Sequence, residues 1–174
     1  MAILSVLLPP APPLKAKAKP VDKVDDDIRR LIDDMLETMY AAPGIGLAAN
    51  QVGVLKRVIV LDIARSEEPP TPLALINPEV VWASEETAVF NEGCLSVPEH
   101  YADVERPAEV KVRFLDRKGV RQEIHAKGLL STCIQHEMDH LEGVLFVDHL
   151  SALKRNMILR KLSKQRKHQA ESAL

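Results

Sequence analysis

The stretch QHEMDH, residues 135–140, constrains the possible folds more than any other part of the sequence. Its two histidines, His136 and His140, are four residues apart, which is close to one helical turn, so both side chains project from one face of a helix. Glu137 follows the first histidine directly and can reach a group held between the two rings. This HExxH pattern is typical of metal hydrolases, but it supplies only two ligands, so a third must come from elsewhere.

The rest of the chain has an ordinary globular composition. Its 174 residues are enough for one domain with a sizeable core, which we expect to span residues 1–174. Aromatic residues make up only 3%, so the core must be aliphatic. A net charge of −2 argues against a protein that coats nucleic acid, and we expect no DNA partner.

The two cysteines, Cys94 and Cys133, are too few for a disulfide scaffold and suggest a reducing compartment. The opening MAILSVLLPP has no basic residue before its apolar run and is broken by prolines, so it does not read as a signal peptide. No stretch approaches the roughly 18 apolar residues of a membrane span. We therefore expect a cytoplasmic protein without a membrane partner.

Periodicity predicts helices at both ends of an α+β domain. Residues 1–20 read as an extended, proline-rich arm, followed by a helix from Asp25 to Tyr40 with one apolar face made by Ile28, Leu31, Ile32, Met35 and Met39. The metal-binding helix is expected from Leu129 to Leu141 and is ended by Gly143. A last helix is expected from Ser151 to His168.

Short strands are predicted between these helices, at residues 57–63, 73–82, 87–90, 108–116 and 120–126, the last two forming a hairpin. The glycine-rich stretch 42–53 is expected to be a shaped loop. The resulting architecture is a set of small antiparallel or mixed β-sheets packed around a central HExxH helix, with an N-terminal and a C-terminal helix.

The C-terminal segment 151–174 is basic, with seven Lys or Arg residues against one acidic residue, Glu171. One interpretation is a solvated helix that packs through Leu153, Met157 and Leu162. The other is an electrostatic contact with RNA or another acidic surface.

Cys94, in NEGCLSVP, is the best candidate for the third metal ligand. Gly93 allows the backbone to turn tightly before it, and a set of two histidines and one cysteine leaves one coordination position open for water. Cys133 is the rival, but it lies on the same helix as the histidines, and one helix cannot easily place three donors around one ion. We therefore place Thr132 and Cys133 in the wall of the adjacent pocket. The alternative for Cys94 is a packing role in the core.

Three motifs occur in a fixed order: PGIGLAANQVG (residues 43–53), EGCLSVP (92–98) and QHEMDHLEG (135–143). Together they resemble the signature motifs of the peptide deformylase family, and the likeness extends over about residues 20–150. The resemblance implies an amide hydrolase of protein biosynthesis, which removes the formyl group from the N-formylmethionine of new polypeptides and releases formate.

The resemblance also implies roles for particular residues. Cys94, His136 and His140 would hold a metal that activates water, with Glu137 as general base and then acid. The side-chain amide of Gln51 and the backbone N–H of Leu95 would stabilise the oxyanion. The metal is expected to be Fe²⁺ in the cell, with Zn²⁺, Ni²⁺ or Co²⁺ also able to occupy the site.

Further residues are candidates for binding the substrate. Gly46 has no β-carbon, so a substrate backbone can approach it like an added strand. The slot for methionine would be lined by Ile45, Leu129, Thr132 and Cys133, although each could equally be core. Glu92 pairs with Arg106 either to brace the loop that carries Cys94 or as a surface ion pair.

Two other classes of protein remain as alternatives. A metal-stabilised binding module, docking on the ribosome through the basic last helix, would have a fourth protein ligand on its metal. An ordinary zinc peptidase would share the HExxH helix but would require neither Cys94 nor the Gln51 loop.

Overall fold

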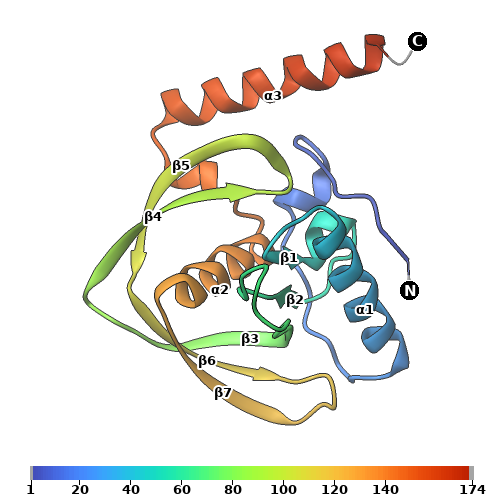
Figure 1. Cartoon of the computed structure of the whole chain (residues 1–174), viewed down its shortest axis with the longest axis vertical. Helices are drawn as coiled ribbons and strands as arrows, with labels where there is room; N and C mark the ends of the chain where they lie inside the picture. Colours follow the sequence, from blue (N-terminus) through green and yellow to red (C-terminus); the bar gives the residue numbers. More distant parts are fainter. Residues whose placement is uncertain (1, 173–174) are drawn as a thin grey trace.

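The helix α2 (Gly128–Leu141) runs through the centre of the computed structural model and contacts two antiparallel sheets (Figure 1). The structure describes the backbone of residues 2–172 and the side chains of residues 2–167. Its other elements are α1 (Asp26–Ala41), α3 (Ala152–Ser172), the 3₁₀ helices η1 (Pro12–Lys15), η2 (Ala49–Val52) and η3 (Phe146–His149), and the strands β1 (Gly46–Ala48), β2 (Val58–Leu61), β3 (Leu73–Ala83), β4 (Thr87–Cys94), β5 (Val97–Pro107), β6 (Glu109–Leu115) and β7 (Arg121–Lys127).

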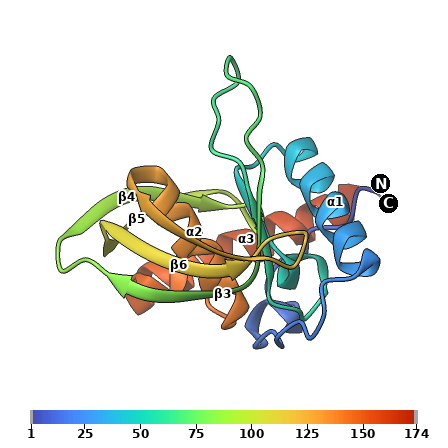
Figure 2. The same ribbon diagram turned by 90° about the horizontal axis from the view of Figure 1, so that it is seen from below.

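The larger sheet has five strands in the order β1-β2-β3-β6-β7, and β4 and β5 form a separate hairpin. All these pairs are antiparallel. The loop between β2 and β3 projects away from the body of the molecule (Figure 2). The α+β architecture around a central helix is therefore confirmed.

The central strand β2 shows how the core is divided. All four of its residues are buried, and because side chains alternate along a strand, they face opposite layers. Ile59 and Leu61 pack into the cluster that contains Ile134 of α2. Val58 and Val60 pack into the cluster with α1. The sheet is thus covered by a helix on each face, which explains why β2 reads as a continuous apolar run.

The two predicted helices that flank this sheet are confirmed, each within one residue at both ends. In α1, the Asp25 carboxylate caps the N-terminus by accepting the Ile28 N–H at 3.0 Å. Ile28, Ile32, Met35 and Met39 form its buried face, and Leu31 is partly buried beside them. Gly143 follows α2 in a left-handed conformation (φ +76°), as a C-terminal glycine does.

The predicted loop at residues 42–53 is wrong for its central part. Gly46–Ala48 pairs with β2 as strand β1, and Ala49–Val52 forms η2. Sequence periodicity also missed β5, whose eleven residues pair along most of β4. Cys94 therefore lies at the end of a strand in a hairpin, and not in a free loop. The N-terminal arm is extended except for η1.

The predicted packing face of the last helix is only partly correct. Leu162 is buried, but Leu153 and Met157 are 73% and 46% exposed. Ile158 and Leu159 take their place against the hairpin and η3, because they lie on the same side of the helix as Leu162. The prediction for residues 173–174 falls outside the described residues. Among the described residues, no helix is both long and apolar enough to cross a membrane.

Candidate metal centre

Three potential metal ligands from distant parts of the chain converge at the centre of the molecule. His136 and His140 project from α2, and Cys94 reaches them from the end of β4. One donor atom from each residue lies within 4.8 Å of the other two. The hairpin β4–β5 thus brings to the helix the sulfur that the HExxH stretch lacks.

The spacing of these donors fits a bound transition metal. The Cys94 Sγ and His140 Nε2 atoms are 3.4 Å apart. An ion bound by both at ordinary lengths in a tetrahedral arrangement would separate them by about 3.6 Å. Burial is the main cause that lowers the pKa of His140 well below its ordinary value, so the imidazole stays neutral, the form that binds metals.

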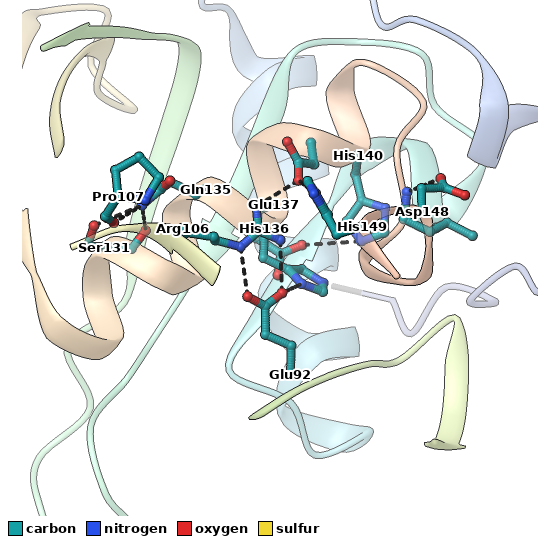
Figure 3. A network of polar contacts seen from close by, with 12 residues as sticks. Glu92, Arg106, Pro107, Ser131, Gln135, His136, Glu137, His140, Asp148 and His149 are labelled. Carbon is teal, nitrogen blue, oxygen red and sulfur yellow. Dashed lines mark hydrogen bonds and ion pairs between the residues drawn. The ribbon is translucent and has the colours of Figure 1, made fainter. Parts of the chain in front are cut away.

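The imidazole ring of His136 is oriented by a carboxylate. His136 Nδ1 lies 2.9 Å from Glu92 Oε1 (Figure 3). When Nδ1 carries the proton and donates it to Glu92, the lone pair on Nε2 is available to a metal.

Cys133 stands apart from this group. Its thiol contacts the carbonyl oxygen of Ile45 at 3.8 Å. Burial, together with the negative charges of Glu137 and Glu92, raises the pKa of the Cys133 thiol well above its ordinary value. A protonated thiol is a poor metal ligand, so Cys94 is the sulfur that suits the site.

Glu137 lies beside the donor group in a water-poor position. Its Oε1 atom is 3.9 Å from His140 Nε2 and has no hydrogen-bond partner within residues 2–167. Burial is the main cause that raises the pKa of Glu137 to about 7, because desolvation penalises the charged form. A carboxyl group with this pKa can both accept and release a proton near neutral pH.

Cys94, His136 and Glu137 line a cavity of about 270 Å³, and His140 is fully buried behind it. Of the predicted residues, Ile45, Gly46, Gln51 and Leu95 line it. A β-carbon at Gly46 would overlap the Glu137 carboxylate, so this glycine makes room for the side chain that would do the chemistry. A larger cavity of about 610 Å³ between β3, β6 and β7 contains none of the candidate site residues.

The other predicted pocket residues lie behind or beside this lining. Thr132 and Cys133 are buried in α2, and the contact between the Cys133 thiol and the Ile45 carbonyl places that thiol behind the wall. Leu129 is 43% exposed and is not part of the lining.

Gln51 is held in place by three groups. Its Oε1 atom accepts the Ala48 N–H at 2.9 Å, which directs the amide nitrogen toward the hairpin. That nitrogen donates to Ser96 Oγ at 3.0 Å and lies 3.4 Å from Cys94 Sγ. Leu95 and Ser96 form the turn between β4 and β5, and Leu95 and Gln51 line the same cavity.

Glu92 and Arg106 form a buried ion pair and not a surface one. Arg106 donates through Nε to Glu92 Oε2 at 2.7 Å and through Nη2 to Oε1 at 2.9 Å. Burial opposes the charge on Glu92, but these hydrogen bonds and the one with His136 outweigh it and hold the Glu92 pKa below its ordinary value.

Three residues of the site were not predicted: Ser96, Tyr101 and Asp139. Tyr101 lines the cavity and packs on Gly93, where a β-carbon would lie 2.5 Å from the ring. The sequence offers little to single out Tyr101 as a cavity residue, beyond its being one of only two tyrosines. Asp139 could have been noticed because it lies three residues after His136, on the flank of the same helix.

Comparisons of the sequence with known proteins point to one family. A family model described as polypeptide deformylase matches residues 3–156. The chain is 60% identical over 167 residues to a peptide deformylase of Phenylobacterium zucineum, covering 96% of this chain and 99% of that protein.

Solved structures give the same result. A peptide deformylase from Ehrlichia chaffeensis matches with a TM-score of 0.93 and 39% identity, over 97% of this chain and 99% of that one. A structure from the same organism in complex with actinonin matches with a TM-score of 0.91 and 42% identity, over 95% and 98% of the two chains. On these matches, the chain belongs to the polypeptide deformylase family.

Proposed function

We propose that this chain removes the formyl group from the N-terminal N-formylmethionine of newly synthesised polypeptides, by hydrolysis at a single divalent metal. The observation that carries the proposal is the convergence of Cys94, His136 and His140 beside the buried carboxyl group of Glu137. We further propose that residues 1–174 act as one domain and work in the cytoplasm.

Glu137 acts as general base and then as general acid for the proton of the attacking water. When bound, the metal supplies Lewis-acid chemistry, which lowers the pKa of water from about 15.7 toward about 7. The unpartnered Glu137 Oε1 atom accepts the proton and later delivers it to the departing amine. The pKa of about 7 supports both roles.

Gln51 and Leu95 stabilise the oxyanion that forms on the formyl carbon. The bond from Ala48 N–H to Gln51 Oε1 fixes the amide, one N–H of which donates to Ser96 Oγ at 3.0 Å. The other N–H, 3.4 Å from Cys94 Sγ, is the donor for the oxyanion. The Leu95 backbone N–H is held by the hairpin turn. Fixed donors of this kind require no reorganisation during the reaction.

The substrate backbone binds along β1. This strand is at the edge of the five-stranded sheet, paired with β2 on one side only. Its other edge can pair with an extended peptide, which gives affinity that depends little on the peptide's sequence. The methionine side chain enters beside Ile45, with Leu129, Thr132 and Cys133 forming its surroundings.

The metal in the cell is proposed to be Fe²⁺, with Zn²⁺, Ni²⁺ and Co²⁺ as possible substitutes. A set of one thiolate and two imidazoles suits any of these ions.

Hydrolysis of formyl-Met-Ala-Ser by wild type and Glu137→Ala tests the proposal. We expect formate release by wild type only, with equal metal content in the two proteins. Equal rates would remove Glu137 from the mechanism, and no formate from metal-loaded wild type would refute the deformylase function.

The basic helix α3 supports contact with the ribosome as a second proposal. Lys154, Arg160, Lys161, Lys164, Arg166 and Lys167 are all exposed on it. Exposed cations neutralise RNA phosphates, and such binding weakens steeply as salt rises. Co-sedimentation with ribosomes at several salt concentrations, before and after Lys161→Glu and Lys164→Glu, measures this directly. Binding that neither the salt nor the charge reversal changes would refute it.

A further inference from the structure

Asp139 lies on the metal helix between the two candidate ligands. At 3.6 residues per turn, a residue three positions after His136 lies about 60° from it around the helix axis. Asp139 therefore points along the flank of α2 next to His136. Its carboxylate accepts a hydrogen bond from Arg106 Nη1 at 2.8 Å.

The same guanidinium holds Glu92, so the interactions form a closed ring. Starting at α2, His136 Nδ1 meets Glu92 Oε1 at 2.9 Å. Arg106 binds both oxygens of Glu92 through Nε and Nη2, and its remaining terminal nitrogen returns to α2 at Asp139. Figure 3 shows Glu92 between Arg106 and His136.

This ring fixes Glu92 relative to the helix at two points. Glu92 and Arg106 both belong to the β4–β5 hairpin, so their mutual pairing alone does not fix either of them to α2. The bond between His136 and Glu92 is one attachment, and Asp139 is the other. Without Asp139, the His136–Glu92 hydrogen bond would be the only one that joins the Glu92–Arg106 pair to α2, although Gln135 Nε2 would still hold the hairpin backbone at the Pro107 carbonyl oxygen (2.9 Å).

A second contact supports Asp139 from the C-terminal side. His149 Nε2 lies 2.8 Å from Asp139 Oδ2. His149 ends η3, which also carries Phe146, and the Phe146 ring stacks on the His136 imidazole with centroids 6.1 Å apart. The short helix η3 thus contacts both the His136 ring, through Phe146, and the Asp139 carboxylate, through His149.

We infer that Asp139 is a positioning residue for the metal ligand His136, acting through Arg106 and Glu92, with His149 as its outer support. The inference rests on the proposed metal centre. Groups that hydrogen-bond a metal-bound histidine fix its ring and tautomer, and their loss lowers metal retention by about 10- to 100-fold.

The test measures metal release from the full-length chain loaded with Co²⁺. Excess chelator is added, and the decay of the cobalt–thiolate absorption gives the release rate. We expect Asp139→Ala to release Co²⁺ about 10- to 100-fold faster than wild type. Asp139→Asn keeps the shape of the side chain but not its charge, and we expect an intermediate rate. The matched control is Asp103→Ala, an exposed carboxylate of the same hairpin bonded to Asn91.

A positioning role and a purely structural one give different results. If Asp139→Ala lowers the melting temperature of the metal-free protein but releases Co²⁺ within twofold of wild type, Asp139 only braces the fold and the inference is overturned. Should Asp139→Ala fail to fold, a wild-type release rate in Asp139→Asn overturns it equally. Metal release does not require turnover, so the two proposals can fail separately. If metal-loaded wild type does not hydrolyse formyl-Met-Ala-Ser but Asp139→Ala still releases Co²⁺ faster than wild type, the proposed function is refuted and this inference stands.

Discussion

Removing the guanidinium of Arg106 should be among the most destabilising single changes in this chain. Arg106 and Glu92 are only 6% and 5% exposed, and Arg106→Met would leave the Glu92 carboxylate buried without its cation. Breaking a buried pair from one side costs about 3–5 kcal/mol. For a domain of this size, each kcal/mol lowers the melting temperature by roughly 2–4 °C, so we expect a loss of about 6–20 °C.

The assay is thermal unfolding of the metal-free protein, with Arg113→Met as the matched control. Arg113 pairs with Glu123 at 3.5 Å, with side chains 68% and 49% exposed. An exposed pair of this kind contributes about 0–1 kcal/mol. The double variant Glu92→Leu with Arg106→Met should recover much of the lost stability, because two apolar side chains can replace a buried pair. It should nevertheless bind metal weakly, since His136 loses its acceptor.

The outcome that would refute this reasoning is a loss for Arg106→Met no larger than that for Arg113→Met. The pair would then contribute no more than a surface ion pair does.

Three further predictions concern the metal pocket. Gly46→Ala should lower turnover of formyl-Met-Ala-Ser by about 100-fold at unchanged metal content, because the new methyl group displaces Glu137 by about 1 Å; turnover within threefold of wild type would contradict it. Cys133→Ala should keep one metal per chain by elemental analysis, whereas Cys94→Ala should lose it, and the reverse result would make Cys133 the ligand. Aerobic purification should abolish the activity of the iron form, and added Ni²⁺ or Co²⁺ should restore it, because thiolate-bound Fe²⁺ is prone to oxidation; a fully active, air-stable iron protein would argue against this.

The helices and the histidine pair of the candidate metal centre could be predicted from the sequence because their signals are local. The apolar face and the acidic start of α1 are complete within sixteen residues, and the HExxH spacing requires only one helical turn. Cys94 could be named because a thiolate complements two imidazoles, and the motif order narrowed the choice.

The missed elements depend on partners distant in the sequence. β1 has only three residues and two nearby glycines, and it is a strand because β2 pairs with it. β5 carries four charged side chains and no clean alternation of apolar and polar residues, and its pairing with β4 defines it. Leu153 and Met157 are predicted on the packed face of α3 together with Leu162, but η3 and the hairpin meet the face that joins Leu162 to Ile158 and Leu159.

Apart from the Glu92–Arg106 pair, the polar connections of the site could not be predicted from the sequence. Ser96 orients Gln51 across 45 residues, and Arg106 reaches Asp139 across 33. No periodicity indicates which of many charged residues will meet in a buried network. Such pairs become visible only once the hairpin is packed on α2.

X-ray absorption of the metal-loaded chain tests the central claim most directly. We predict one sulfur at about 2.3 Å and two imidazole nitrogens at about 2.0–2.1 Å, with an oxygen from water completing the coordination. The sulfur signal should disappear in Cys94→Ala. A sphere without sulfur, or one closed by four protein ligands, would contradict a hydrolytic centre built from Cys94, His136 and His140.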